Sequence, residues 1–217
     1  MSSKCHYSVV IVAAAALSGC GGHSAARVAP EDPFATIPIA TLPVGSLAGS
    51  SALLMAVGAI VAGDSTDPLP AINAQRLALI EVANAAIDTA LRRDARAINW
   101  MGLAEQRRVA RRSPTLGVDP DRLPTVYLVG PRVQRVPDPL WAGMRTLVAM
   151  TGARMAIVPA VARITGHPGA LTAEFMLVIV DARTGEVLWR GRSVGVPSPT
   201  AEAALASAAG AAVGGIR

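Results

Sequence analysis

The residues with the clearest chemistry lie near the start of the chain. Leu17, Ser18, Gly19 and Cys20 match a lipobox, in which an aliphatic residue and two small residues precede a cysteine. The small side chains leave the backbone before Cys20 open to a peptidase. The Cys20 thiol is the atom to which a diacylglycerol would be attached. We therefore expect cleavage before Cys20 and lipidation of its sulfur.

The segment before the lipobox has the features of a signal peptide. Lys4 gives a weakly cationic start, and Val9 to Leu17 form a short apolar run. This run is too short to span a bilayer, which needs about 20 apolar residues. We expect residues 1–19 to be a lipoprotein signal peptide. A buried core helix, or a signal peptide with an incidental cysteine, are the alternatives.

The expected anchor predicts a location. Two or three acyl chains, such as palmitate, hold a protein stably on a membrane, because each buried CH₂ contributes about 0.8 kcal/mol. Gly21 follows Cys20 in place of the aspartate that resembles an inner-membrane retention signal in enteric bacteria. The expected location is therefore the cell envelope, on the outer membrane facing the periplasm. The membrane, reached through this lipid, is the first expected partner.

The cysteines and histidines exclude several kinds of chemistry. Cys5 leaves with the signal peptide and Cys20 carries the lipid, so disulfides, catalytic thiols and cysteine metal sites are excluded from the mature domain. His23 lies in the segment after the lipobox, and His167 lies in a Gly-His-Pro-Gly turn. We expect no metal, no cofactor and no catalytic residue.

One part of the chain is strongly basic. Residues 92–112 hold seven arginines against two carboxylates, a net charge of +5 that equals the net charge of the whole chain. The rest of the mature protein is nearly neutral, so a single basic patch is expected. The candidate partner-binding residues are Arg107, Arg108, Arg111 and Arg112. The alternative is a helix face that is merely solvated.

The first half of the chain predicts a tether followed by alternating strands and helices. Residues 21–50 are rich in Gly, Ala, Ser and Pro and indicate a tether. Residues 51–61 suit one or two buried strands. Helices are expected over 71–92 and 103–112, with a short strand over 94–100. The apolar stripe of the longer helix is expected at Leu77, Ile80, Ile87 and Leu91.

The second half predicts a helix, a strand, a β-hairpin and a last helix. The segments are 125–129 (a short strand in a proline-rich loop), 138–151 (helix), 153–164, 173–182 and 186–194 (strands) and 200–213 (helix). Asp138 and Thr200 suit helix N-caps, and Gly152 suits a helix end. Pro159 indicates an edge strand or a bulge. Thr184 and the glycine after it suit the hairpin turn.

This order defines the expected architecture. It predicts an α/β fold, with a mixed β-sheet packed with helices in one compact domain. The expected divisions are a signal peptide over 1–19, a lipidated cysteine and flexible tether over 20–50, and the α/β domain over 51–217.

The hairpin carries a resemblance to a known group. Val180 to Trp189 (VDARTGEVLW) resembles the D-x-x-T-G-E-hydrophobic-hydrophobic-W hairpin of periplasmic lipoproteins with the TolB N-terminal-like α/β fold, which include the CsgG and LpoB types. Leu147 to Val158 resembles the helix, Gly-Ala-Asp and strand passage of that group, with Arg154 in place of the acid. The resemblance covers about residues 50–213. It implies docking onto envelope proteins, regulation of a synthase or a secretion pore, mostly without catalysis.

Three functions are compared on this basis. The favoured one is a non-enzymatic, membrane-anchored accessory or docking subunit for an envelope assembly, secretion or cell-wall complex, with an unknown envelope protein as partner and a possible homo-oligomer. A pore is disfavoured because no pair of membrane strands of about 9–11 residues is present. The second is binding of anionic lipid or cell-wall polymer by the arginines. Nucleic acid is disfavoured by the expected export.

The third function is a carboxylate-dependent hydrolase. Its candidate acids are Asp64, Asp67, Asp119, Asp121 and Glu174. The four aspartates more simply suit turns, and no phosphate-binding loop is present. This is the least favoured alternative.

Overall fold

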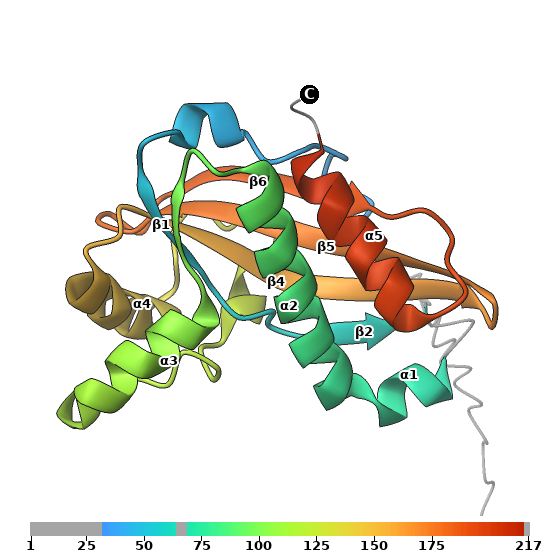
Figure 1. The fold of residues 1–217 in the computed structure, drawn as a ribbon, viewed down its shortest axis with the longest axis horizontal. Helices are drawn as coiled ribbons and strands as arrows, with labels where there is room; N and C mark the ends of the chain where they lie inside the picture. Colours follow the sequence, from blue (N-terminus) through green and yellow to red (C-terminus); the bar gives the residue numbers. More distant parts are fainter. Residues whose placement is uncertain (1–31, 64–68, 215–217) are drawn as a thin grey trace, which may run out of the picture. The chain divides into compact units, whose positions relative to one another are not determined.

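A six-stranded mixed sheet organises the computed structural model (Figure 1), which describes residues 32–63 and 69–214. The strand order is β3-β1-β4-β5-β6, and β2 pairs with β4 beyond β1. The strands are β1 (Ser51–Leu54), β2 (Ile60–Ala62), β3 (Asn99–Met101), β4 (Met155–His167), β5 (Ala170–Asp181) and β6 (Val187–Val194). β1 runs parallel to β3 and β4, whereas β4, β5 and β6 are antiparallel. The predicted mixed α/β sheet is confirmed.

Five α-helices and three short 3₁₀ turns accompany the sheet in the described residues. The helices are α1 (Pro70–Ala74), α2 (Arg76–Asp94), α3 (Leu103–Arg112), α4 (Asp138–Thr151) and α5 (Ala201–Val213). The 3₁₀ turns are η1 (Val44–Leu47), η2 (Pro114–Leu116) and η3 (Thr125–Leu128). The lipobox, Cys20, Asp64 and Asp67 lie outside the described residues.

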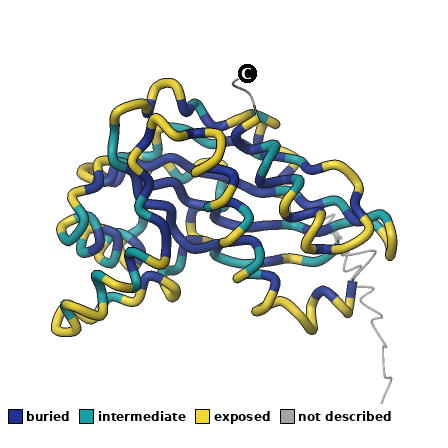
Figure 2. The backbone as a smooth tube through the Cα atoms, viewed as in Figure 1, coloured by how far each residue is buried: buried dark blue, intermediate teal, exposed yellow. Residues whose placement is uncertain are grey.

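The two faces of the sheet are covered by different elements (Figure 1). α2 and α5 lie side by side on the first face, where Phe175, Leu177 and Ile179 of β5 are buried against them. α4 covers part of the second face, with Met144 and Leu147 buried among strand residues. β5 is thus covered on both sides, as its apolar sequence predicted. Figure 2 shows the buried residues along these central strands.

The long strand β4 contains the predicted irregularity. Its register with β5 shifts between Pro159 and Val161, because proline has no N–H to donate to the ladder. β4 lies between β5 and the β1 and β2 strands, so it is a central strand with a bulge and not an edge. The hairpin turn and the final helix are also as predicted. Asp181 Oδ1 accepts the N–H of Arg183 at 2.7 Å, and Thr200 Oγ1 accepts the N–H of Ala203 at 3.2 Å.

Several local predictions were wrong. Leu77, expected in the buried stripe, is 82% exposed, because the helix breaks at Gln75 and α2 buries a stripe that starts at Leu79. Residues 125–128 form η3 and not a strand. The Thr125 hydroxyl there donates to the Ala56 carbonyl at 3.4 Å. Asp138 is the first residue of α4 and not its N-cap.

Residues 32–50 differ from the flexible tether expected over 20–50. Phe34, Ile37 and Leu42 are buried, although the sequence of this segment has no periodicity that predicts their burial. The N–H of Ala40 donates to the Arg192 carbonyl at 3.0 Å, so the segment runs beside the outer edge of β6. We call residues 32–40 the N-terminal strap. The tether expectation is therefore corrected for residues 32–50, because backbone hydrogen bonds and apolar burial hold them on the domain.

Candidate docking surface

Helix α3 is fixed to the domain by its inner side. Leu103 and Gln106 are buried, and Gln106 Nε2 donates to the carbonyls of Leu54 at 2.7 Å and Met101 at 2.9 Å. Glu105 Oε2 accepts the N–H of Gly102 at 3.1 Å, which stabilises the first turn. These contacts determine which side of α3 faces the solvent.

Arg107 links α3 to two other parts of the chain. Its Nε and Nη2 donate to the Asp121 carboxylate at 2.7 to 3.0 Å, and Nη2 lies 3.3 Å from Glu81 Oε1 on α2. The hydrogen bonds to Asp121, with the attraction of both carboxylates, raise the pKa of Arg107 although partial burial opposes this. Arg107, one of the four predicted partner-binding residues, is committed to internal ion pairs.

The other three predicted arginines are exposed on the outer side of α3. Arg108, Arg111 and Arg112 are spaced i, i+3 and i+4, so they share one helix face. Within the described part of the chain, none of the three guanidinium groups forms a hydrogen bond or an ion pair. Arg111 and Arg112 lie in the last turn, where cations stabilise the helix dipole. Arg108 lies one turn earlier, where that explanation does not apply.

Two other arginines of the basic segment form ion pairs within the chain, and a third bonds to a backbone carbonyl. Arg92 Nε donates to Asp88 at 2.9 Å, and Arg93 Nη2 donates to Asp94 at 2.6 Å. Arg96 Nε donates to the Arg93 carbonyl at 3.0 Å. Of the seven arginines, only three have guanidinium groups without any hydrogen bond or ion pair in the described residues, and we call them the α3 arginine face (Arg108, Arg111 and Arg112).

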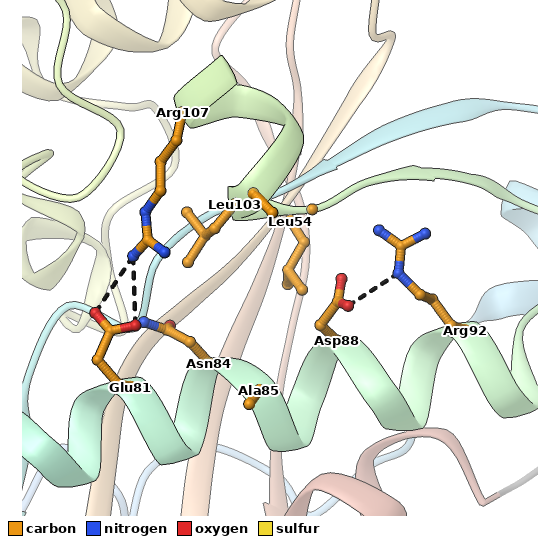
Figure 3. A pocket seen from close by; sticks show the side chains of 10 residues that line it. Leu54, Glu81, Asn84, Ala85, Asp88, Arg92, Leu103 and Arg107 are labelled. Carbon is orange, nitrogen blue, oxygen red and sulfur yellow. Dashed lines mark hydrogen bonds and ion pairs between the residues drawn. The ribbon is translucent and has the colours of Figure 1, made fainter. Parts of the chain in front are cut away.

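A small pocket lies between α3 and α2 (Figure 3). Its volume is about 180 Å³, and its labelled lining residues are Leu54, Glu81, Asn84, Ala85, Asp88, Arg92, Leu103 and Arg107. The charged groups face one another in pairs, Glu81 with Arg107 and Asp88 with Arg92 (Figure 3). This pocket was not predicted from the sequence, although the i, i+4 spacing of Asp88 and Arg92 was a visible signal. Its charges balance, so it does not favour a charged ligand.

Among the described residues, the remaining candidate acids do not form a common site. Asp119 Oδ1 accepts the N–H of Asp121 at 3.0 Å in a turn, and Glu174 pairs with two arginines on the sheet. His167 is exposed at the β4–β5 turn. Over residues 32–63 and 69–214, no group of three His, Cys, Asp or Glu side chains could hold a metal. None of the helices in these ranges is long and apolar enough to cross a membrane.

Comparisons with known proteins give structural neighbours and no family. No protein-family model matches the chain, and no curated protein matches it. It is similar to the LpoB C-terminal domain from Salmonella enterica, at 15% identity over 68% of this chain and 82% of that chain, with a TM-score of 0.36. It is similar to LpoB from E. coli solved by NMR, at 16% identity over 88% of this chain and 84% of that chain, also with a TM-score of 0.36.

A third neighbour is a lipoprotein, GNA1162 from Neisseria meningitidis. The identity is 12% over 68% of this chain and 80% of that chain, and the TM-score is 0.35. LpoB structures are thus among the neighbours, as the hairpin resemblance predicted. TM-scores of this size carry no argument about function, which rests on the contacts described above.

Proposed function

We propose that this chain is a lipid-anchored envelope lipoprotein, without catalysis of its own, that docks onto another envelope protein. Its role would be that of an accessory subunit in an envelope assembly, secretion or cell-wall complex. The observation that carries the docking role is the α3 arginine face. These three cations are unpaired in the described residues, on a helix whose opposite side is fixed by buried hydrogen bonds.

This arrangement suits recognition of an acidic protein surface. A guanidinium group binds a carboxylate through two parallel hydrogen bonds, so arginine adds geometry to charge. Because the helix is already held in place, little ordering of the backbone is needed when a partner binds. Exposed charges act mainly on the rate of association, and salt weakens their effect.

The first experiment tests capture from intact membranes. The anchored protein is crosslinked and purified as wild type, as Cys20→Ala, and with Arg108, Arg111 and Arg112 all changed to Glu. We expect wild type to enrich one envelope complex, Cys20→Ala to lose it, and the triple variant to lose it while staying folded and anchored.

A matched control separates α3 from net charge. Arg76, Arg132 and Arg135 are exposed arginines outside α3, with no ion pair in the described residues. Changing all three to Glu alters the net charge equally and should leave capture unchanged. Equal loss in both triple variants, or capture by neither wild type nor control, would contradict the proposal. If the variant with Arg108, Arg111 and Arg112 changed to Glu lost binding to anionic lipid but still captured the complex, the anionic-lipid alternative would be favoured.

A further inference from the structure

A second basic surface lies beside α4, outside the basic segment 92–112. A groove of about 550 Å³ runs between α4, η2 and the end of β5. Its lining residues are Leu116, Ala142, Arg145, Thr146, Val148, Ala149, Ala182 and Arg183. The floor is made of alanines and a valine. The only charged side chains in this lining are two arginines.

Neither arginine in the groove has a counter-ion. Arg145 and Arg183 are exposed, and their guanidinium groups form no ion pair or hydrogen bond with the described residues. The nearest acid in sequence, Asp181, is engaged elsewhere. Its Oδ1 accepts the backbone N–H groups of Arg183 at 2.7 Å and Thr184 at 3.0 Å. The groove therefore keeps a net positive charge.

The groove also exposes apolar surface next to these charges. Leu116 is 52% exposed, which is high for a large apolar side chain. Ala142, Thr146 and Ala149 follow the i, i+4 and i+7 spacing of one helix face, so small side chains line the groove along α4. The Thr146 hydroxyl donates to the Ala142 carbonyl at 3.1 Å. Its proton is therefore not available for a hydrogen bond to a ligand in the groove.

We propose that this groove binds a short acidic segment of the partner protein. One apolar side chain of that segment would lie on the alanine floor against Leu116, and carboxylates on either side of it would reach Arg145 and Arg183. Charge complementarity selects this occupant, because an apolar segment alone would leave both cations unpaired and a simple anion would leave the floor exposed. Since η2 follows α3 directly, the same partner could contact the α3 arginine face.

This inference rests on the proposed function for the identity of the partner, but its binding chemistry is tested separately. The probe is a fluorescein-labelled hexapeptide of alternating glutamate and leucine. It is titrated against the full-length lipidated protein in nanodiscs of zwitterionic lipid, with empty nanodiscs as the blank. We expect Arg145→Glu with Arg183→Glu to weaken binding about tenfold or more.

Matched variants locate the binding. Arg132→Glu with Arg135→Glu makes the same charge change elsewhere, and it should leave the affinity within about twofold. A peptide of glutamate and serine should bind more weakly, because it lacks the apolar side chain. Equal binding of both peptides, equal effects of the two double variants, or complete competition by phosphatidylglycerol nanodiscs would overturn the proposal.

A photo-crosslinking pair distinguishes the groove from the α3 arginine face in cells. The crosslinker is placed at Thr146 in the groove or at Ala104 on α3, in the membrane-anchored protein. The expected product at Thr146 joins a partner segment in which acids flank an apolar residue. A protein adduct from Ala104 but none from Thr146 would overturn the groove proposal and leave the proposed function standing. Peptide binding at the groove with no protein adduct from either position would overturn the proposed function and the assignment of a partner segment to the groove, and would leave only its affinity for acidic peptides.

Discussion

Two groups of arginines in this molecule have the same side chain and opposite surroundings. Arg163, Arg190 and Arg192 lie on the second face of the sheet, near the N-terminal strap, and all three have partners. The arginines of the α3 face and the α4 groove are exposed, and no described residue pairs with them. In the first group, each guanidinium group that is largely buried has partners within the chain.

Each arginine of the sheet group makes specific contacts through its terminal Nη atoms, whereas its buried Nε has no partner in the described residues. Glu174 Oε2 lies 3.0 Å from Arg163 Nη2 and 3.2 Å from Arg192 Nη1, so one carboxylate serves two cations. Arg190 has no acid beside it, and burial lowers its pKa. It donates instead to the carbonyls of Gly130 at 2.6 Å and Val133 at 2.9 Å. A covered guanidinium needs such partners because desolvation penalises an unpaired charge.

The arginines of the sheet group therefore stabilise the fold, whereas those of the α3 arginine face and the groove are free to bind a partner. In the sheet group, removing a partner should cost stability. On the α3 arginine face and in the groove, removing the cation should weaken binding and leave stability nearly unchanged.

Glu174→Ala should have the largest effect. It removes the carboxylate shared by Arg163 and Arg192, whose side chains are only 16% and 17% exposed, and leaves two poorly hydrated cations close together. We expect the free energy of unfolding to fall by about 2–3 kcal/mol, measured by urea denaturation. Glu186→Ala, at an exposed position on the hairpin, should change it by less than about 0.5 kcal/mol. Similar losses for both variants would mean that the sheet cluster does not stabilise the fold.

A paired arginine and an unpaired arginine occupy adjacent positions of α3, so the substitutions Arg107→Ala and Arg108→Ala can be compared directly. Arg107→Ala removes the pairs with Asp121 and Glu81, so the free energy of unfolding should fall by about 0.5–1 kcal/mol. Arg108→Ala removes no pair and relieves repulsion from Arg112 at i+4, so stability should stay within about 0.3 kcal/mol. Thermal and urea unfolding of both variants provide the measurement. The reverse order would show that Arg108 has a structural partner.

Local patterns were enough to predict much of the fold. The apolar run of β5, the Thr-Gly turn and the Thr200 cap each act within a few residues, and all three were predicted correctly. The limits of α3 were also correct, because an amphipathic pattern and the following Ser-Pro mark its end. In the candidate surface, three of the four named arginines are exposed as a docking role requires.

Features that depend on distant residues could not be predicted. The N-terminal strap has no period of its own, and its order comes from the edge of β6 and from Arg163. Arg107 was assigned to binding because its partners, Asp121 and Glu81, are 14 and 26 residues away. The α4 groove joins Leu116 to Arg183 through tertiary packing. No spacing rule connects such pairs.

Asp32 provides the smallest test, at the point where the strap meets the sheet cluster. Its Oδ2 accepts a hydrogen bond from Arg163 Nη1 at 2.6 Å, and the guanidinium of Arg163 also lies 4.1 Å from the centroid of the Phe34 ring. Partial burial raises the pKa of Asp32, but the hydrogen bonds from Arg163 and the Phe34 N–H, with the charges of Arg163 and Arg192, outweigh burial. The pKa therefore lies below its ordinary value of 3.8.

A carboxylate with a depressed pKa stabilises the fold above its unfolded pKa and loses that contribution as the pH falls through the folded pKa. Asp32→Asn keeps an oxygen for the Phe34 N–H but removes the charge. We expect wild type to exceed Asp32→Asn in stability by no more than about 0.5 kcal/mol at pH 6, because the carboxylate side chain is 45% exposed. Urea denaturation at a series of pH values should show this difference shrinking below about pH 4. A difference that does not change with pH would mean that the ion pair does not hold the strap, and that its apolar contacts alone do.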